Sequence, residues 1–219
     1  MEAVRKGRGL KPDQEADMKE HGVPEWYLES CKKIQYMFPK AHAAAYVMMA
    51  YRIAYCKVNY PLAYYAAFFT IRAKAFSYAL MCHGPEKVNH MIAEYAERKK
   101  SGPKLSAKEE DTLRDLKIVQ EMYARGIEFL PIDIYKSKAL AFQIVDGKLL
   151  PPFNSIDGMG EKAATLAEEA AQDGPYLSRS DFQKRSKVNG TIMEVMEQEG
   201  LFGDLPKDTQ LSLFDIDLI

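Results

Sequence analysis

Two turns in the last third of the 219-residue chain combine residue types that suit a phosphate group. The first, Gly158-Met159-Gly160, stands before a predicted helix whose first turn contains Lys162. Glycine lets the backbone adopt a positive φ and come close to a phosphate, and a helix N-terminus offers free N–H groups. We expect Met159 to anchor the turn in the core. Because Gly-x-Gly turns also simply connect helices, the weight of this pattern comes from Lys162 and from the second turn.

The second turn lies within residues 182–190, before a helix predicted at 191–199, and three basic side chains surround it. Contacts made by such turns fall on the nucleic-acid backbone and not on the bases. The pattern therefore predicts binding of duplex DNA without sequence preference. The predicted duplex-binding residues are Gly158, Gly160, Lys162, Lys184, Arg185 and Lys187.

A basic corner occurs near residue 40. Lys32 and Lys33 end one predicted helix, and Lys40 and His42 begin the next after Pro39. The N–H groups and dipole of a helix N-terminus favour an anion, so the corner suits a phosphate. The alternative is a solvated basic loop in which His42 caps the helix or packs locally.

The tail carries an apolar peptide, Gln210-Leu211-Ser212-Leu213-Phe214, between acidic residues. A short apolar patch on a polar tail, which we expect to be disordered, cannot bury itself, so a groove on a partner is the natural place for it. Gln210 would fix its register by hydrogen bonds. The predicted contact residues are Gln210, Leu211, Leu213 and Phe214. The alternative is a tail that folds back on its own body.

The composition excludes several classes of protein. A net charge of −1 gives no global signal for nucleic acid, so local clusters must carry that argument. The three cysteines, Cys31, Cys56 and Cys82, are far apart and predict neither a disulfide framework nor a zinc site. The longest apolar run, Ala43–Tyr51, is far shorter than the roughly 20 residues that span a bilayer. With no secretion signature at the N-terminus, we expect a cytoplasmic protein without membrane contact.

The spacing of apolar residues predicts a mainly α fold with a small β element. Helices are expected near 12–20, 25–36, 41–58 and 62–78, and again after Pro85 and Ser106, where Ser106…Glu109 forms a capping box. The stretch 41–58 is apolar almost all round, which predicts a central, buried helix. Asp146-Gly147 predicts a hairpin between residues 142–145 and 149–150, and helices return after residue 152.

Several stretches resemble the end of the fingers domain of bacterial C-family DNA polymerases, most closely the PolC type. They are Phe38–Tyr46, Arg52–Tyr55 and Tyr60–Ala67, and Val4–Gly7, Trp26-Tyr27 and Cys31–Lys33 are also similar, so that the resemblance covers most of residues 1–80. It implies that six residues lie near the incoming nucleotide or the primer–template. These residues are Arg5, Lys6, Lys33, Lys40, His42 and Tyr46. An aromatic such as Tyr46 within an apolar helix is, however, more often part of a core.

The two turns resemble helix-hairpin-helix units, paired as in the duplex-binding domain of the same family. The tail peptide is similar to the bacterial pentapeptide Gln-Leu-x-Leu-Phe, which binds the sliding clamp. This resemblance implies four regions. They are the C-terminal part of the fingers at 1–100, a connecting helix and β-hairpin at 101–150, a tandem helix-hairpin-helix domain at 151–203 and a flexible tail with the clamp peptide at 204–219.

Polymerase chemistry needs carboxylates that hold two metal ions, and in this family they lie in the palm, upstream of the fingers. Asp215-Ile216-Asp217 is rejected as such a site because it lies in the tail. We therefore expect a fragment that is inactive alone, binds no cofactor and works with magnesium, deoxynucleoside triphosphate and the upstream domains in the complete polymerase. The alternatives are a free-standing adaptor between duplex DNA and the clamp and, least favoured, a small helical enzyme that uses His42 with Lys40.

Overall fold

The computed structural model describes residues 2–37, 40–102 and 104–208 and divides the chain into two compact units, Met1–Tyr55 and Cys56–Ile219. The prediction of a mainly helical chain with one small β element is confirmed. The four predicted regions, with boundaries after residues 100, 150 and 203, stay a prediction. The predicted tail at 204–219 falls largely outside the described residues, and so does the whole clamp peptide.

The first unit contains three short helices and the start of a long one. They are α1 (Glu2–Arg5), α2 (Pro12–Glu20), α3 (Glu25–Lys33) and α4 (Lys40–Asn59). The helix predicted at 25–36 thus ends three residues early. Gly7 allows a close approach of two backbone segments, because a Cβ atom there would lie 1.5 Å from the Gln35 carbonyl oxygen. The Met37 N–H donates to the Arg5 carbonyl at 2.9 Å and ties the segment after α3 to α1.

The prediction of a buried helix at 41–58 is wrong for this chain. None of the residues of α4 is buried, and all except Lys57 are exposed. Hydropathy all round a helix predicts burial only if the polypeptide supplies apolar surface on every side. The described residues supply no such surface around α4.

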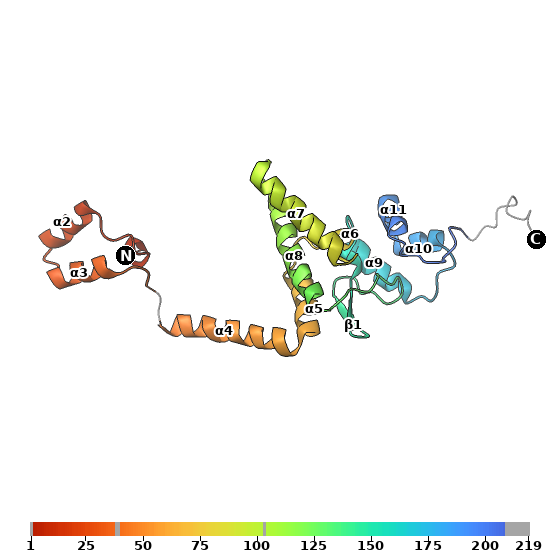
Figure 1. Cartoon of the computed structure of the whole chain (residues 1–219), viewed down its shortest axis with the longest axis horizontal. Coiled ribbons are helices and arrows are strands. Elements are labelled where there is room, and N and C mark those ends of the chain that lie inside the picture. Colours follow the sequence, from red (N-terminus) through yellow and green to blue (C-terminus); the bar gives the residue numbers. More distant parts are fainter. Residues whose placement is uncertain (1, 38–39, 103, 209–219) are drawn as a thin grey trace, which may run out of the picture. The chain divides into compact units, whose positions relative to one another are not determined.

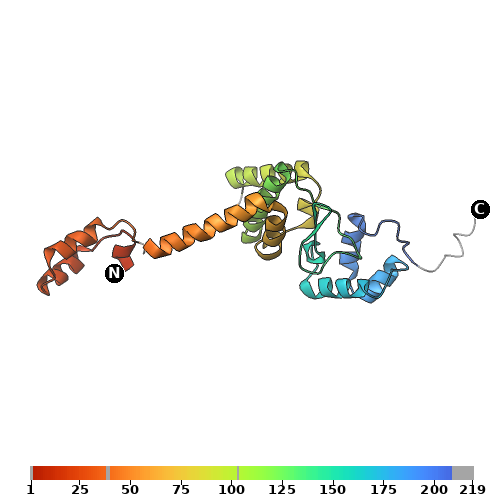
Figure 2. The same ribbon diagram turned by 90° about the horizontal axis from the view of Figure 1, so that it is seen from below.

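The second unit begins with a helical cluster around an aromatic core. It contains α5 (Pro61–Ile71), α6 (Tyr78–Met81), α7 (Pro85–Ser101) and α8 (Ala107–Ala124). The long helices α7 and α8 lie side by side, with Val88, Leu116 and Val119 fully buried between the elements of this cluster (Figures 1 and 2). The capping box of α8 is confirmed, because Ser106 Oγ accepts from the Glu109 N–H and Glu109 Oε2 accepts from the Ser106 N–H.

The helix predicted at 62–78 is interrupted. The chain leaves α5 at Ile71, and Ala75 N–H then donates to Asp115 Oδ2 at 3.0 Å. Ser77 caps α6 by accepting from the Leu80 N–H. The residues between α5 and α6 therefore form a loop, and Ser77 of this loop contacts Asp157.

The hairpin predicted around Asp146-Gly147 is confirmed. Strands β1 (Gln143–Val145) and β2 (Lys148–Leu150) pair antiparallel, with Ile144 opposite Leu149. Asp146 and Gly147 both have positive φ, at 50° and 76°. Two such residues in succession form the two-residue turn whose twist matches that of the strands.

A second core follows the hairpin. Around it lie η1 (Phe153–Ser155), α9 (Glu161–Ala171), α10 (Arg179–Ser186) and α11 (Gly190–Gln198). The small residues Ala164 and Ala167 are fully buried and let α9 pack closely on its neighbours. Two polar contacts connect this half with the α5–α8 cluster: Ser77 Oγ donates to Asp157 Oδ2 at 2.6 Å, and His83 Nε2 lies 2.6 Å from Glu199 Oε2.

Candidate nucleic-acid interface

The two predicted turns share three features in the same order. In the first, Gly158 has φ +86°, Met159 is buried, and Gly160 is the extended N-cap of α9. In the second, Lys187 has φ +55°, Val188 is buried, and Asn189 is the extended N-cap of α11. Each turn therefore consists of a left-handed residue, a buried apolar anchor and an N-cap. The expectation that Met159 anchors its turn in the core is confirmed.

The two glycines of the first turn have different roles, which corrects the expectation of positive φ at both. Gly160 has φ −76° and ψ 162°, a conformation open to any residue. A Cβ atom at Gly160 would meet no atom within 4 Å. The absence of a side chain there leaves the space in front of α9 open, and only Gly158 is required by its backbone conformation.

The N-termini of α9 and α11 also differ. Asn189 Oδ1 accepts from the Ile192 N–H at 2.9 Å, so one donor at the start of α11 is already satisfied. Within the described residues, no side chain caps α9. Free N–H groups and the positive end of the helix dipole together favour an anion. The first turn is consequently the better anion site of the two.

Three of the four predicted basic residues are accessible. Lys162, Lys184 and Lys187 are exposed, and none of them forms an ion pair with another described residue. Lys162 follows the N-cap of α9 by two residues, and Lys184 and Lys187 flank the end of α10. These positions next to the two turns add positive charge to that of the helix dipoles.

Arg185 differs from these lysines, because its guanidinium already has partners within the chain. Its guanidinium donates to the carbonyls of Ala170, Gly174 and Pro175 and lies 3.5 Å from Asp181 Oδ2. It also stacks on Tyr176, with Cζ 4.4 Å from the ring centroid. These contacts occupy its Nη donors and stabilise the connection between α9 and α10. The predicted contact of Arg185 with DNA stays a prediction.

The residues predicted in the first unit are at the surface, where few contacts connect them. Arg5 and Lys6 both pair with Glu2 at 3.0 Å, and hydrogen bonds from Arg5 and then from Lys6 lower the pKa of Glu2 to about 2. The rings of His42 and Tyr46 lie 4.4 Å apart on successive turns of α4, and Tyr46 is exposed rather than part of a core. Lys33 and Lys40 are exposed.

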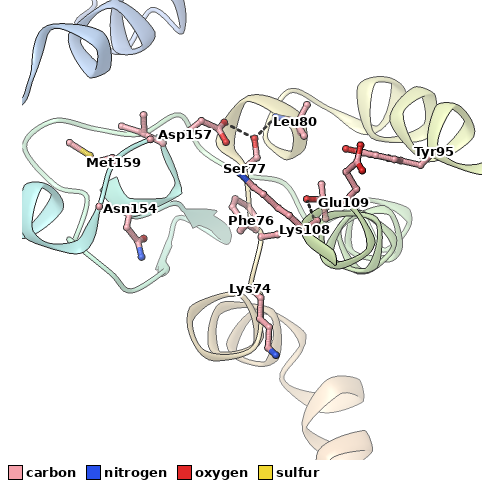
Figure 3. A pocket seen from close by; sticks show the side chains of 15 residues that line it. Lys74, Phe76, Ser77, Leu80, Tyr95, Lys108, Glu109, Asn154, Asp157 and Met159 are labelled. Atoms are coloured by element: carbon pink, nitrogen blue, oxygen red, sulfur yellow. Dashed lines mark hydrogen bonds between the residues drawn. The ribbon is translucent and has the colours of Figure 1, made fainter. Parts of the chain in front are cut away.

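The structure contains a pocket beside the first turn that the sequence did not predict. It has a volume of about 500 Å³, and Lys74 and Lys108 line it together with Gly158 and Gly160 (Figure 3). Lys108 lies in the first turn of α8, some fifty residues before the glycines. Only tertiary packing brings these residues together. The sequence held no signal of this proximity beyond the position of Lys108 in the capping box.

The last described residues are fixed to α10. The N–H groups of Arg179 and Ser180 donate to the carbonyls of Pro206 and Lys207 at 2.8 and 3.2 Å, and Ser180 Oγ donates to the latter at 2.9 Å. No helix in the part of the chain that the structure describes is long and apolar enough to cross a membrane.

Comparisons with known proteins gave two kinds of match, one to a segment of the C-terminal half and one to nearly the whole chain. A family model described as "Helix-hairpin-helix motif" matches residues 126–211. Over 98% of its length the chain is 48% identical to "DNA polymerase III PolC-type" of Streptococcus sanguinis (strain SK36) and to the protein of the same name from Bacillus subtilis (strain 168). It is 45% identical to that of Caldanaerobacter subterraneus subsp. tengcongensis. The chain spans about 15% of the length of these relatives.

Proposed function

Because the chain belongs to the PolC-type DNA polymerase III family, we propose that it is the C-terminal part of a replicative DNA-directed DNA polymerase and that it holds the DNA backbone. The observation that carries the proposal is the uncapped N-terminus of α9 behind Gly158-Met159-Gly160. The N–H groups of α9 receive one phosphate, and the lysines around both turns neutralise the neighbouring phosphates.

This arrangement suits a polymerase that must accept any sequence. Backbone N–H groups and lysines recognise phosphates, whose positions are similar in every duplex, and they make no contact with base edges. Affinity then comes from released counterions, so it falls steeply as the salt concentration rises.

A second part of the proposal concerns the first unit. Arg5, Lys6, Lys33, Lys40, His42 and Tyr46 would contact the incoming nucleotide or the primer–template. The support is the exposure of Lys6, Lys33 and Lys40 and the pair of rings at the start of α4. In the complete enzyme these groups would act beside carboxylates supplied by other domains.

The chemistry itself would take place outside this chain. Within residues 2–37, 40–102 and 104–208, no three His, Cys, Asp or Glu side chains are grouped as a metal site. The resemblance implies that the magnesium of the complete polymerase is held by carboxylates of other domains, and this stays part of the proposal. We expect the purified chain to incorporate no nucleotide, and incorporation in the presence of magnesium would contradict this.

The third part of the proposal is tethering to the sliding clamp through Gln210, Leu211, Leu213 and Phe214. These residues lie outside the described part of the chain, and the support is their pattern alone. A tether of this kind raises the effective concentration of the DNA-binding residues near the duplex. Deleting residues 210–214 should abolish binding to the clamp and leave the affinity for free duplex DNA unchanged. Clamp binding by the deletion variant would defeat this part.

The test of DNA binding compares two lysines. The affinity of the full chain for a blunt duplex is measured at several salt concentrations, and the slope of log affinity against log salt is determined. Lys162→Ala should reduce this slope by about 0.9, the value for one phosphate contact in B-DNA. Lys117→Ala, which removes an exposed lysine of α8, is the matched control and should leave the slope unchanged. Absence of duplex binding by the parent chain would overturn the proposed function.

A further inference from the structure

The pocket beside the first turn lies within the second unit and is built by four segments. They are the loop between α5 and α6, the first turn of α8, Tyr95 of α7, and residues 154–160. Gly158 and Gly160 form one wall, and Lys108 extends into the pocket from α8 in the direction of Ser77 (Figure 3). Because Gly160 is both a lining residue and the N-cap of α9, the pocket lies next to the N-terminus of α9.

The charges around the pocket do not cancel. Lys74 and Lys108 are exposed, and neither forms an ion pair with another described residue. Glu109 also lines the pocket, but Arg98 Nη2 lies 2.7 Å from its Oε1, and both the N–H and the hydroxyl of Ser106 donate to it. The remaining acidic group is Asp157, which accepts a hydrogen bond from Ser77. The lining thus contains two lysines and a single uncompensated carboxylate; the Lys74 side chain points away from Asp157 (Figure 3).

The contact between Ser77 and Asp157 also explains how the pocket keeps its form. Ser77 is buried, and its hydroxyl both caps α6 and holds the residue before Gly158. The first turn is therefore fixed to the same loop that carries Lys74. Its position relative to Lys108 follows from packed elements and not from a mobile connection.

We infer that this pocket binds the phosphodiester backbone of the strand held by the first turn, at a phosphate next to the one received by α9. Lys108 neutralises that phosphate, and Lys74 adds positive charge at the rim. The inference rests on the proposed function, and it extends the DNA-binding surface to residues that precede the matched helix-hairpin-helix segment in the sequence. A strand bound at the N–H groups of α9 would run directly past the mouth of the pocket.

The test uses the full chain and two lysines of one helix. Lys108 and Lys117 are nine residues apart in α8, and at about 100° per residue they lie on opposite faces. Lys108→Ala should lower the slope of log affinity against log salt by about 0.9 on a duplex, or by about 0.7 if the strand in the pocket is unpaired. Lys117→Ala should leave the slope unchanged. Blunt duplexes and duplexes with a single-stranded extension distinguish the two sources of phosphate.

A second experiment removes a negative charge from the pocket instead of a positive one. Asp157→Asn keeps an acceptor for the Ser77 hydroxyl and removes the negative charge beside the bound strand. The affinity should therefore rise at low salt, and the gain should shrink as salt is added because screening weakens the repulsion that was removed. Unfolding curves for all variants should match that of the parent, since each altered side chain is at the surface.

The outcomes separate this inference from the proposed function. If the parent chain binds DNA and Lys162→Ala lowers the slope, but Lys108→Ala behaves like Lys117→Ala, the pocket is not part of the interface and the inference fails. If the parent chain does not bind DNA, the proposed function fails and the inference with it. A lowered slope for Lys108→Ala on the extended duplex alone assigns the pocket to an unpaired strand.

Discussion

At the scale of the residue, the two glycines of the first turn separate folding from binding. Gly158 has φ +86°, a conformation that costs other residues roughly 1–2 kcal/mol, whereas Gly160 has φ −76° and free space where a Cβ would stand. Gly158→Ala should therefore lower the free energy of unfolding by about 1 kcal/mol. Gly160→Ala requires no change of backbone conformation, so its cost should be limited to the roughly 0.5–1 kcal/mol by which Ala is a poorer N-cap than Gly. It should weaken DNA binding, because the methyl group would stand in front of the N–H groups of α9.

Urea unfolding and DNA titration of both variants check this prediction. The parent chain and Asn189→Ala serve as references, since the latter removes the side-chain cap of α11 and should cost about 1 kcal/mol of stability. Equal DNA affinity for Gly160→Ala and the parent chain would contradict the assignment of α9 as the phosphate site.

The basic residues around α10 lead to a second prediction at this scale. Arg185 is largely buried and donates to three carbonyl groups, which a single ammonium cannot satisfy together. Arg185→Lys should therefore lower the free energy of unfolding by roughly 1–2 kcal/mol, since the partly buried carbonyl groups of Ala170 and Gly174 lose a charged donor. The salt dependence of DNA binding should not change. Lys184→Ala should leave the free energy of unfolding unchanged and lower the slope of log affinity against log salt. A lowered slope for Arg185→Lys would show that Arg185 touches DNA.

At the scale of the element, the features that the sequence predicted correctly depend on neighbouring residues. The capping box of α8 and the Asp146-Gly147 turn each form within four residues. Both could therefore be predicted from the residue types alone. The interruption after Ile71 is not, because it depends on Asp115, forty residues away, which accepts from the Ala75 N–H. The role of Arg185 and the approach of Lys108 to the first turn likewise arise only from packing.

The capping box also predicts a dependence of stability on pH. Hydrogen bonds from the Ser106 N–H and hydroxyl, and then from Arg98, lower the pKa of Glu109 from 4.5 to about 2. A carboxyl with a depressed pKa in the folded state stabilises the fold above its unfolded value and loses this effect as pH falls through the folded value. Glu109→Gln should therefore be less stable than the parent at pH 7, and the difference should shrink between pH 4.5 and pH 2.

Urea unfolding at several pH values measures this effect. The matched control is Glu110→Gln, which removes the same charge from the adjacent exposed position in α8. Glutamine can still complete a capping box, so the variant reports mainly the loss of charge. A difference between Glu109→Gln and the parent that stays constant from pH 7 to pH 2 would contradict the ionised capping box.

For the molecule as a whole, the most unusual feature is the exposed apolar surface of α4. Val47, Tyr51 and Ile53 are each more than half exposed on a helix that is apolar almost all round. Such a surface is normally covered by protein, and the chain spans only about 15% of the length of its relatives. The apolar character of α4 thus predicted burial, whereas the structure leaves its described residues exposed.

The exposed apolar residues of α4 should promote self-association of the isolated chain. In the isolated chain, replacing Val47, Tyr51 and Ile53 by Gln should reduce self-association, measured by sedimentation, and leave the unfolding of residues 56–219 unchanged, because no buried contact is lost. In the complete polymerase the same three changes should be strongly destabilising, since a large apolar side chain contributes about 1.5–3 kcal/mol when it is fully buried. If the complete protein tolerated them, α4 would be a surface helix there too, and its apolar residues would have to serve a contact outside the polymerase chain.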